Sequence, residues 1–201
     1  MTRYHWLVLV IVMALCNSVS AQPFTSYTSM IPMAEFDKTV PELETRDFRH
    51  NGEAEIRISN KKEQHVIFQA ASDGSLLSYV GGITYLMYEF HEDKTYYCRH
   101  CTGLSDRNIL KRLSYYDANG QLKSMRGNTV FAARIEFEIK DLEKFEEAMN
   151  KVDEQEGNYE SKDASAENII EHGFDKEGRL IYSRPISTDD FWSHQNFLGR
   201  P

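Results

Sequence analysis

Cysteine and basic residues are both scarce in this sequence. Only 3 of its 201 residues are cysteine, and 23 lysine and arginine residues stand against 31 aspartate and glutamate residues, for a formal net charge of −8. An acidic chain is a poor ligand for nucleic acid or for an anionic membrane surface, because both attract basic patches. The HExxH, GxSxG and phosphate-loop motifs are missing as well. We therefore expect no nucleic-acid partner, no cofactor and no enzyme of these motif classes.

Apolar runs are short, and the longest one lies near the N-terminus. Residues 6–15 are apolar and follow a basic start, and small residues at 19–21 then offer a cleavage site. This pattern predicts a secretory signal peptide over 1–21. A spanning helix needs ~20 apolar residues, so no membrane span is expected after cleavage. A lipoprotein modified at Cys16 is an alternative, although the residue before it, Leu15, is larger than such sites prefer.

The rest of the chain divides into an irregular arm and one β-rich domain. Residues 22–50 hold three of the five prolines and show no sustained periodicity, which predicts an irregular N-terminal arm. From residue 51 onward, short apolar runs are separated by turn pairs such as Asp73-Gly74 and Asn119-Gly120. Such runs are typical of β-hairpins, and up to eight strands fit between 51 and 139 with little room for crossover helices. We predict a single domain over 51–201 built on an antiparallel β-meander sheet.

One segment breaks the strand pattern. In residues 141–154 apolar side chains recur at three- and four-residue steps behind a capping Asp141, which predicts an amphipathic helix packed on the sheet. A hairpin turning at Glu177-Gly178 follows it, and Thr188 is placed to cap a short C-terminal helix. The predicted fold class is therefore α+β.

A family resemblance accompanies one of the hairpins. The segment LKRLSYYDANGQLKSM carries two aromatics, a polar Asn-Gly turn, a hydrophobic residue and a lysine, from Tyr115 to Lys123. It resembles the units of MORN-variant repeat proteins, which include the antitoxin-like proteins called YwqK. Fainter echoes surround Gly74 and Gly178, at unequal spacings where a true array repeats at a fixed period. The resemblance implies a β-meander scaffold that binds another protein, without catalytic residues to carry over.

The motif YYCRHCTG, residues 96–103, holds the two cysteines that remain after the predicted cleavage. In the oxidising surroundings that export implies, Cys98 and Cys101 are free to pair with each other. Residues three apart in a continuous strand lie ~10 Å apart, whereas a disulfide needs Cα atoms within ~6.8 Å. A disulfide therefore predicts that the strand ends at or just past Cys98 and that the chain turns at Arg99-His100.

Two other uses of this motif remain open. The CxxC spacing fits a redox enzyme, but a thioredoxin-like site places the motif before a helix whose dipole lowers the thiol pKa. The βαβ unit that should precede such a site is not found in the sequence. A soft ion such as copper(I) has Cys98, His100 and Cys101 as candidate ligands. A plain structural disulfide, or an incidental pair of thiols, is favoured over both.

We expect a periplasmic or secreted domain whose function is non-enzymatic binding of a protein or surface partner. An immunity-type inhibitor is one form that such a domain takes. The alternative is a thiol-disulfide oxidoreductase or metal carrier that uses the Cys98-Cys101 pair. The aromatic strands and the tyrosine hairpin supply the expected contact face. Its candidate residues are Tyr85, Tyr88, Tyr96, Tyr97, Tyr115 and Tyr116.

Overall fold

The fold is given by a computed structural model, which describes residues 24–39, 41–48, 52–60, 63–97, 106–125, 132–154 and 168–195. The chain divides into two compact units, Met1–Ile31 and Pro32–Pro201. In the first unit the described part contains the short helix α2, Phe24–Ser29. None of the helices within the described ranges is long and apolar enough to cross a membrane.

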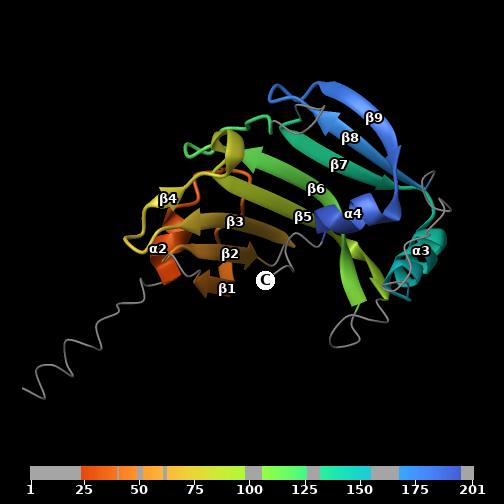
Figure 1. The fold of residues 1–201 in the computed structure, drawn as a ribbon, viewed down its shortest axis with the longest axis horizontal. Helices are drawn as coiled ribbons and strands as arrows, with labels where there is room; N and C mark the ends of the chain where they lie inside the picture. Colours follow the sequence, from red (N-terminus) through yellow and green to blue (C-terminus); the bar gives the residue numbers. More distant parts are fainter. Residues whose placement is uncertain are drawn as a thin grey trace, which may run out of the picture. The chain divides into compact units, whose positions relative to one another are not determined.

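The second unit is built on one antiparallel sheet (Figure 1). The strands cross the sheet in chain order, and each pairs antiparallel with the next, while the short β4 pairs with β3. This arrangement confirms the predicted α+β class and its mainly antiparallel meander. The strands are β1 (Pro41–Phe48), β2 (Ala54–Asn60), β3 (Gln64–Ala70), β4 (Leu76–Leu77), β5 (Tyr85–Tyr97), β6 (Asp106–Tyr116), β7 (Arg134–Ile139), β8 (Ile169–Phe174) and β9 (Leu180–Ile186), with a 3₁₀ turn η1 (Val80–Gly82) before β5.

The prediction of an irregular arm over 22–50 is wrong in part. This stretch contains α2 and the edge strand β1, which pairs with β2 from Pro41↔Asn60 to Phe48↔Ala54. The sequence of β1, PELETRDF, has almost no apolar alternation, so the pattern that marks a half-buried strand is absent. The strand forms through backbone pairing with β2, and an edge strand accommodates proline as its first residue.

Three hairpin turns share one backbone geometry. In residues 71–75, 117–121 and 175–179 the first N–H donates to the fifth carbonyl and the fourth N–H donates to the first carbonyl, at 2.9 to 3.1 Å. The fourth residue of each turn is a glycine with φ between 74° and 85°. A type I turn closed by a left-handed glycine is a common hairpin loop. Because β3, β6 and β8 run in the same direction, the three turns lie at the same end of the sheet (Figure 1).

Helices α3 (Leu142–Glu154) and α4 (Thr188–Gln195) contribute to a core on one face of the sheet, which we call the helix face. The rings of Phe137 in β7 and Phe145 in α3 meet the ring of Phe191 in α4 edge-on, with centroids 5.2 and 5.3 Å apart. Such aromatic pairs contribute about 0.5–1.5 kcal/mol beyond the area that they bury. The same buried cluster includes Tyr88 and Tyr115 of the central strands. The other side of the sheet is called the opposite face below.

Each of these helices begins at a side-chain cap. Asp141 Oδ1 accepts a hydrogen bond from Lys144 N at 3.2 Å, as predicted for α3. At α4 the cap is Ser187 instead of the predicted Thr188. Ser187 Oγ accepts from Asp190 N at 3.0 Å and donates to Asp190 Oδ2 at 2.9 Å. A hydroxyl cap with an acidic residue three positions later satisfies donors at the helix start in the manner of a capping box.

Candidate functional site

The CxxC motif falls in a part of the chain that the structure does not describe, residues 98–105. The disulfide, redox and metal hypotheses for its two cysteines and for His100 therefore stay predictions. The predicted signal peptide and the lipidation candidate Cys16 also lie outside the described residues. After the motif, Asp106–Tyr116 form strand β6, where a thioredoxin-like site places a helix. This strand gives the redox hypothesis no structural support.

Four of the six tyrosines predicted to contact a partner are buried, so the prediction is wrong for them. These are Tyr85, Tyr88, Tyr115 and Tyr116, and none exposes more than 7% of its surface. The side chains of Tyr96 and Tyr97 are outside the described residues. β5 and β6 are the two middle strands of the sheet, and around these tyrosines, at residues 85–88 and 113–116, the side chains of both faces are buried. Burial raises the pKa of Tyr85 to about 12.

A strap, residues 32–39, is bound to the opposite face of the sheet. Gln64 in β3 donates from Nε2 to the Glu35 carbonyl at 3.2 Å and accepts from Asp37 N at 3.1 Å. Tyr116 in β6 donates its hydroxyl hydrogen to Glu35 Oε2 at 2.8 Å. Hydrogen bonds to a charged group contribute about 1.5–3 kcal/mol, so Glu35 and its tyrosine partner fix the strap on the central strands.

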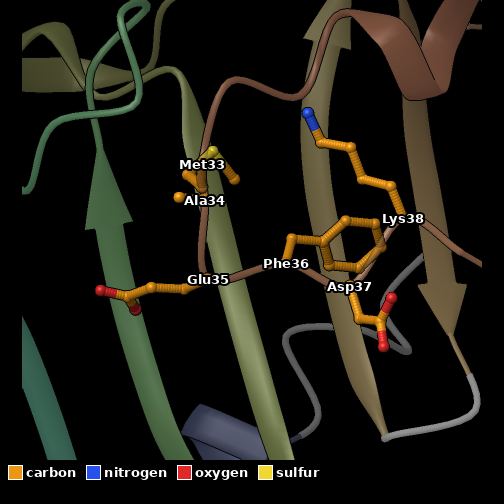
Figure 2. A pocket seen from close by; sticks show the side chains of 6 residues that line it. All are labelled: Met33, Ala34, Glu35, Phe36, Asp37 and Lys38. Atoms are coloured by element: carbon orange, nitrogen blue, oxygen red, sulfur yellow. The ribbon is translucent and has the colours of Figure 1, made fainter.

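An open hollow of about 490 Å³ lies along this strap (Figure 2). Its lining, Met33 to Lys38, comes from consecutive residues of one segment. Figure 2 shows Glu35 reaching toward β6, while Asp37 and Lys38 point in other directions. Small-molecule sites bring a few polar groups together on one ligand. The polar groups here diverge, so we do not assign the hollow as a ligand site.

A carboxylate is buried on the helix face, at Glu171 of β8, which exposes 1% of its surface. Its Oε1 accepts from Tyr182 OH at 2.7 Å and from Arg184 Nε at 3.1 Å, and Arg184 Nη2 lies 2.9 Å away. Nε2 of His194 lies 3.3 Å from its Oε2. One buried charge therefore connects β8, β9 and α4.

The arrangement around Glu171 fixes its protonation state. Burial by itself raises the pKa of this carboxyl, but the neighbouring His194 ring, the hydrogen bond from Tyr182 and the charge of Arg184 outweigh it and lower the pKa to about 2. A general acid or base near neutral pH needs a pKa close to that pH. Glu171 therefore stays ionised near neutral pH, and we assign it a structural role.

Glu171 and its neighbour His172 lie on opposite sides of β8, as adjacent residues of a strand do. His172 Nε2 lies 3.3 Å from Glu138 Oε2 on the opposite face. The histidine that does approach Glu171 is His194, which comes from α4 after the next strand. Nothing in the local sequence signals this pairing, because it depends on how α4 returns over the sheet.

Polar side chains form one row across the opposite face. The register aligns Gln64, Glu89, Arg112, Glu136 and His172 across five strands, from β3 to β8. Gln64 Nε2 donates to Glu89 Oε1 at 3.2 Å. Arg112 Nε lies 2.9 Å from Glu89 Oε2 and 3.6 Å from Glu136 Oε1. The positive charge of Arg112 thus lies between the carboxylates of Glu89 and Glu136, and partly exposed pairs of this kind contribute about 0–1 kcal/mol each.

The two most exposed large apolar side chains of the described residues are neighbours on the edge strand β9. Leu180 is 57% exposed and Ile181 is 47% exposed. A register shift at this point leaves Ile181 opposite no residue of β8, and Pro185 further along has no backbone N–H. Bulges and prolines interrupt a sheet edge and disfavour pairing with another strand. Contacts at this edge are therefore expected to come from side chains.

Comparison of the chain with protein-family models, with curated proteins and with solved structures finds no match. The resemblance to MORN-variant repeats therefore stays a prediction. Within the described part of the chain, no group of three or more histidine, cysteine, aspartate or glutamate side chains is placed to hold a metal ion.

Proposed function

We propose that the chain is an exported, non-enzymatic β-rich domain that binds a protein or surface partner in a periplasmic or secreted setting. The observation that carries the proposal is the exposed pair Leu180 and Ile181 at an interrupted sheet edge. Apolar surface left in water costs about 25 cal/mol per Å² relative to burial, and exposed apolar patches mark interaction sites. In this proposal α3 and α4 pack on the sheet as its structural cover. An immunity-type inhibitor is one form of such a domain.

A photo-crosslinking amino acid at residue 181 is expected to capture the partner in the cells that export the protein. The matched control is the same amino acid at residue 142, because Leu142 is also exposed, at 40%, but lies on α3. Mass spectrometry should find one adduct of defined mass from position 181 and none from position 142. An adduct of twice the mass of the chain would identify a second copy as the partner. Equal capture at both positions, or capture at neither, would contradict the proposal.

The alternative, a thiol-disulfide oxidoreductase or metal carrier, is tested at Cys101. For a binding domain, Cys101→Ser should preserve capture at residue 181. It should lower the free energy of unfolding by less than the about 2–4 kcal/mol typical of disulfides, because the closed loop is short. Intact mass with and without a thiol-blocking reagent reports whether Cys98 and Cys101 are bonded. Readily cycled thiols, or an added metal mass that Cys101→Ser removes, would favour the alternative.

A further inference from the structure

The surface around Leu180 and Ile181 continues over three strands of the opposite face. In β8, buried residues of the helix face alternate with partly exposed residues of the opposite face. The register with β7 and β9 arranges the opposite face in three rows. The rows are Arg134–Phe174–Leu180, Glu136–His172–Ser183 and Glu138–Ile170–Pro185, and together with Ile181 we call them the β7–β9 surface.

Along β8 and β9 this surface is apolar in its two outer rows and polar in the middle row, at His172 and Ser183. Phe174 and Ile170 are partly exposed in β8, next to the exposed Leu180 and Pro185 of β9. On the helix face, β7 and β8 contribute to a core that contains Phe145 of α3 and Phe191 of α4. One face of these strands thus packs with helices of the chain itself, while the apolar side chains of the other face remain in contact with water.

The surface is charged along β7, and its charges are not equally compensated. Arg134 lies with Cζ 4.8 Å from the ring centroid of Phe174 and with Nε 3.3 Å from Glu136 Oε1. Glu138, by contrast, is 60% exposed, and its contact is with His172, which is charged only when protonated. No lysine or arginine of the described residues pairs with Glu138. The carboxylate of Glu138 therefore leaves a negative charge beside the apolar side chains of β8 and β9.

The dimensions of this surface suit a helix. The six residues of β8 extend ~20 Å, because a strand rises ~3.4 Å per residue, and a helix of ~13 residues has the same length. Strands lie ~4.8 Å apart and a helix is ~10 Å wide, so a helix placed over β8 and β9 has one flank above β7.

We propose that the β7–β9 surface docks one amphipathic α-helix of a basic partner protein. The apolar stripe of this helix lies on Phe174, Ile170 and Leu180. A lysine or arginine on the flank of the helix reaches Glu138. The net charge of −8 favours the same partner at long range. This inference rests on the proposed function, because it names the chemistry of the partner that contacts the edge strand β9 at Leu180 and Ile181.

Two synthetic peptides test this proposal against the full chain. Both are amphipathic helices of ~13 residues with leucine on one face, and the other face carries lysine in the first peptide and glutamate in the second. Fluorescence anisotropy should show binding of the lysine peptide and not of the glutamate peptide. Glu138→Lys should weaken binding of the lysine peptide at least tenfold. Salt at ~0.5 M should also weaken it, because exposed charges are then screened within a few ångströms.

The controls separate a defined surface from general charge attraction. Glu143→Lys makes the same charge change on α3, and Leu142→Ser removes an exposed leucine there. Both variants should bind the lysine peptide as the wild type does, whereas Leu180→Ser should lose about tenfold in affinity for it. Equal losses in Glu138→Lys and Glu143→Lys, or unchanged binding by Leu180→Ser, would overturn the proposal. Capture at residue 181 without any preference for the lysine peptide would overturn this inference and leave the proposed function in place.

Discussion

Replacement of Glu171 by glutamine is expected to lower the free energy of unfolding by about 2–4 kcal/mol. Loss of one partner of a buried ion pair typically costs about 3–5 kcal/mol. The lower range applies here because Arg184 is half-exposed and its charge can return to water. Glutamine keeps the shape of the side chain and still accepts from Tyr182, so the loss reports mainly on the charge. Urea unfolding at neutral pH, monitored by circular dichroism, measures this loss of unfolding free energy.

The same variant should change how stability depends on pH. The pKa of Glu171 is about 2 in the folded protein, against an ordinary value of 4.5. Between these values the unfolded chain binds more protons, so acid favours unfolding. The stabilisation that Glu171 provides is therefore complete above about pH 4.5, and it is lost as the pH falls toward 2. The difference in unfolding free energy between wild type and Glu171→Gln should shrink across that window.

Glu92→Gln is the matched control, because Glu92 is an exposed glutamate in β5. It removes one negative charge from the surface and should change the unfolding free energy by less than about 0.5 kcal/mol. If Glu92→Gln and Glu171→Gln had equal effects, the stabilisation would come from net charge alone. The assignment of Glu171 as the structural link between β8, β9 and α4 would then be wrong.

The sequence is most informative where structure depends on neighbouring residues. The turns at 117–121 and 175–179 are fixed by a glycine that adopts positive φ and by an aspartate at the first position. The Oδ1 of Asp117 accepts from the N–H groups of residues 119 and 121, and that of Asp175 does the same two and four residues on. Because all of these groups lie within five residues, the hairpins are predictable from their local sequence.

Strand lengths are less predictable than the turns between them. Six strands, β2 to β7, lie among the described residues between 51 and 139, where up to eight were predicted. β5 and β6 run for 13 and 11 residues and continue through polar stretches such as Glu92–Lys94. Glu92–Lys94 lie in an irregularity of the register, between the pairs Phe90↔Leu110 and Thr95↔Asn108. Pairing with β6 resumes at Thr95, so the local change in polarity does not end the strand.

Side-chain exposure depends on which elements cover the sheet, and the sequence does not show this. Tyr85 and Tyr116 lie on the opposite face, and Tyr116 is held there by Glu35 of the strap. Tyr88 and Tyr115 belong to the core on the helix face. A tyrosine-rich strand has the same local pattern whether it is covered or open. Four tyrosines of the expected contact face are therefore buried, while β9, which has fewer aromatics, carries the exposed Leu180 and Ile181.

Gly173→Ala is expected to lower the free energy of unfolding by about 2–4 kcal/mol. Gly173 pairs with Tyr182 across β8 and β9, and an added Cβ would overlap Cε1 and Cζ of the tyrosine ring. The ring must move away, which costs about 1–3 kcal/mol as overpacking and weakens the hydrogen bond from Tyr182 to Glu171. The glycine is thus required by the ring packed on it and not by its backbone, since its φ is not positive.

Gly178→Ala provides the matched comparison, because Gly178 has room for a Cβ but a positive φ, the reverse of Gly173. No atom lies within 4 Å of a Cβ built at Gly178, but its φ is 81°. That substitution should cost about 1 kcal/mol, from the left-handed backbone alone. In a Tyr182→Ala background, Gly173→Ala should become neutral or stabilising, because alanine is favoured over glycine in a strand once the ring is gone. A cost of Gly173→Ala that persists without the tyrosine ring would show that the backbone, and not the packing around Glu171, requires glycine at this position.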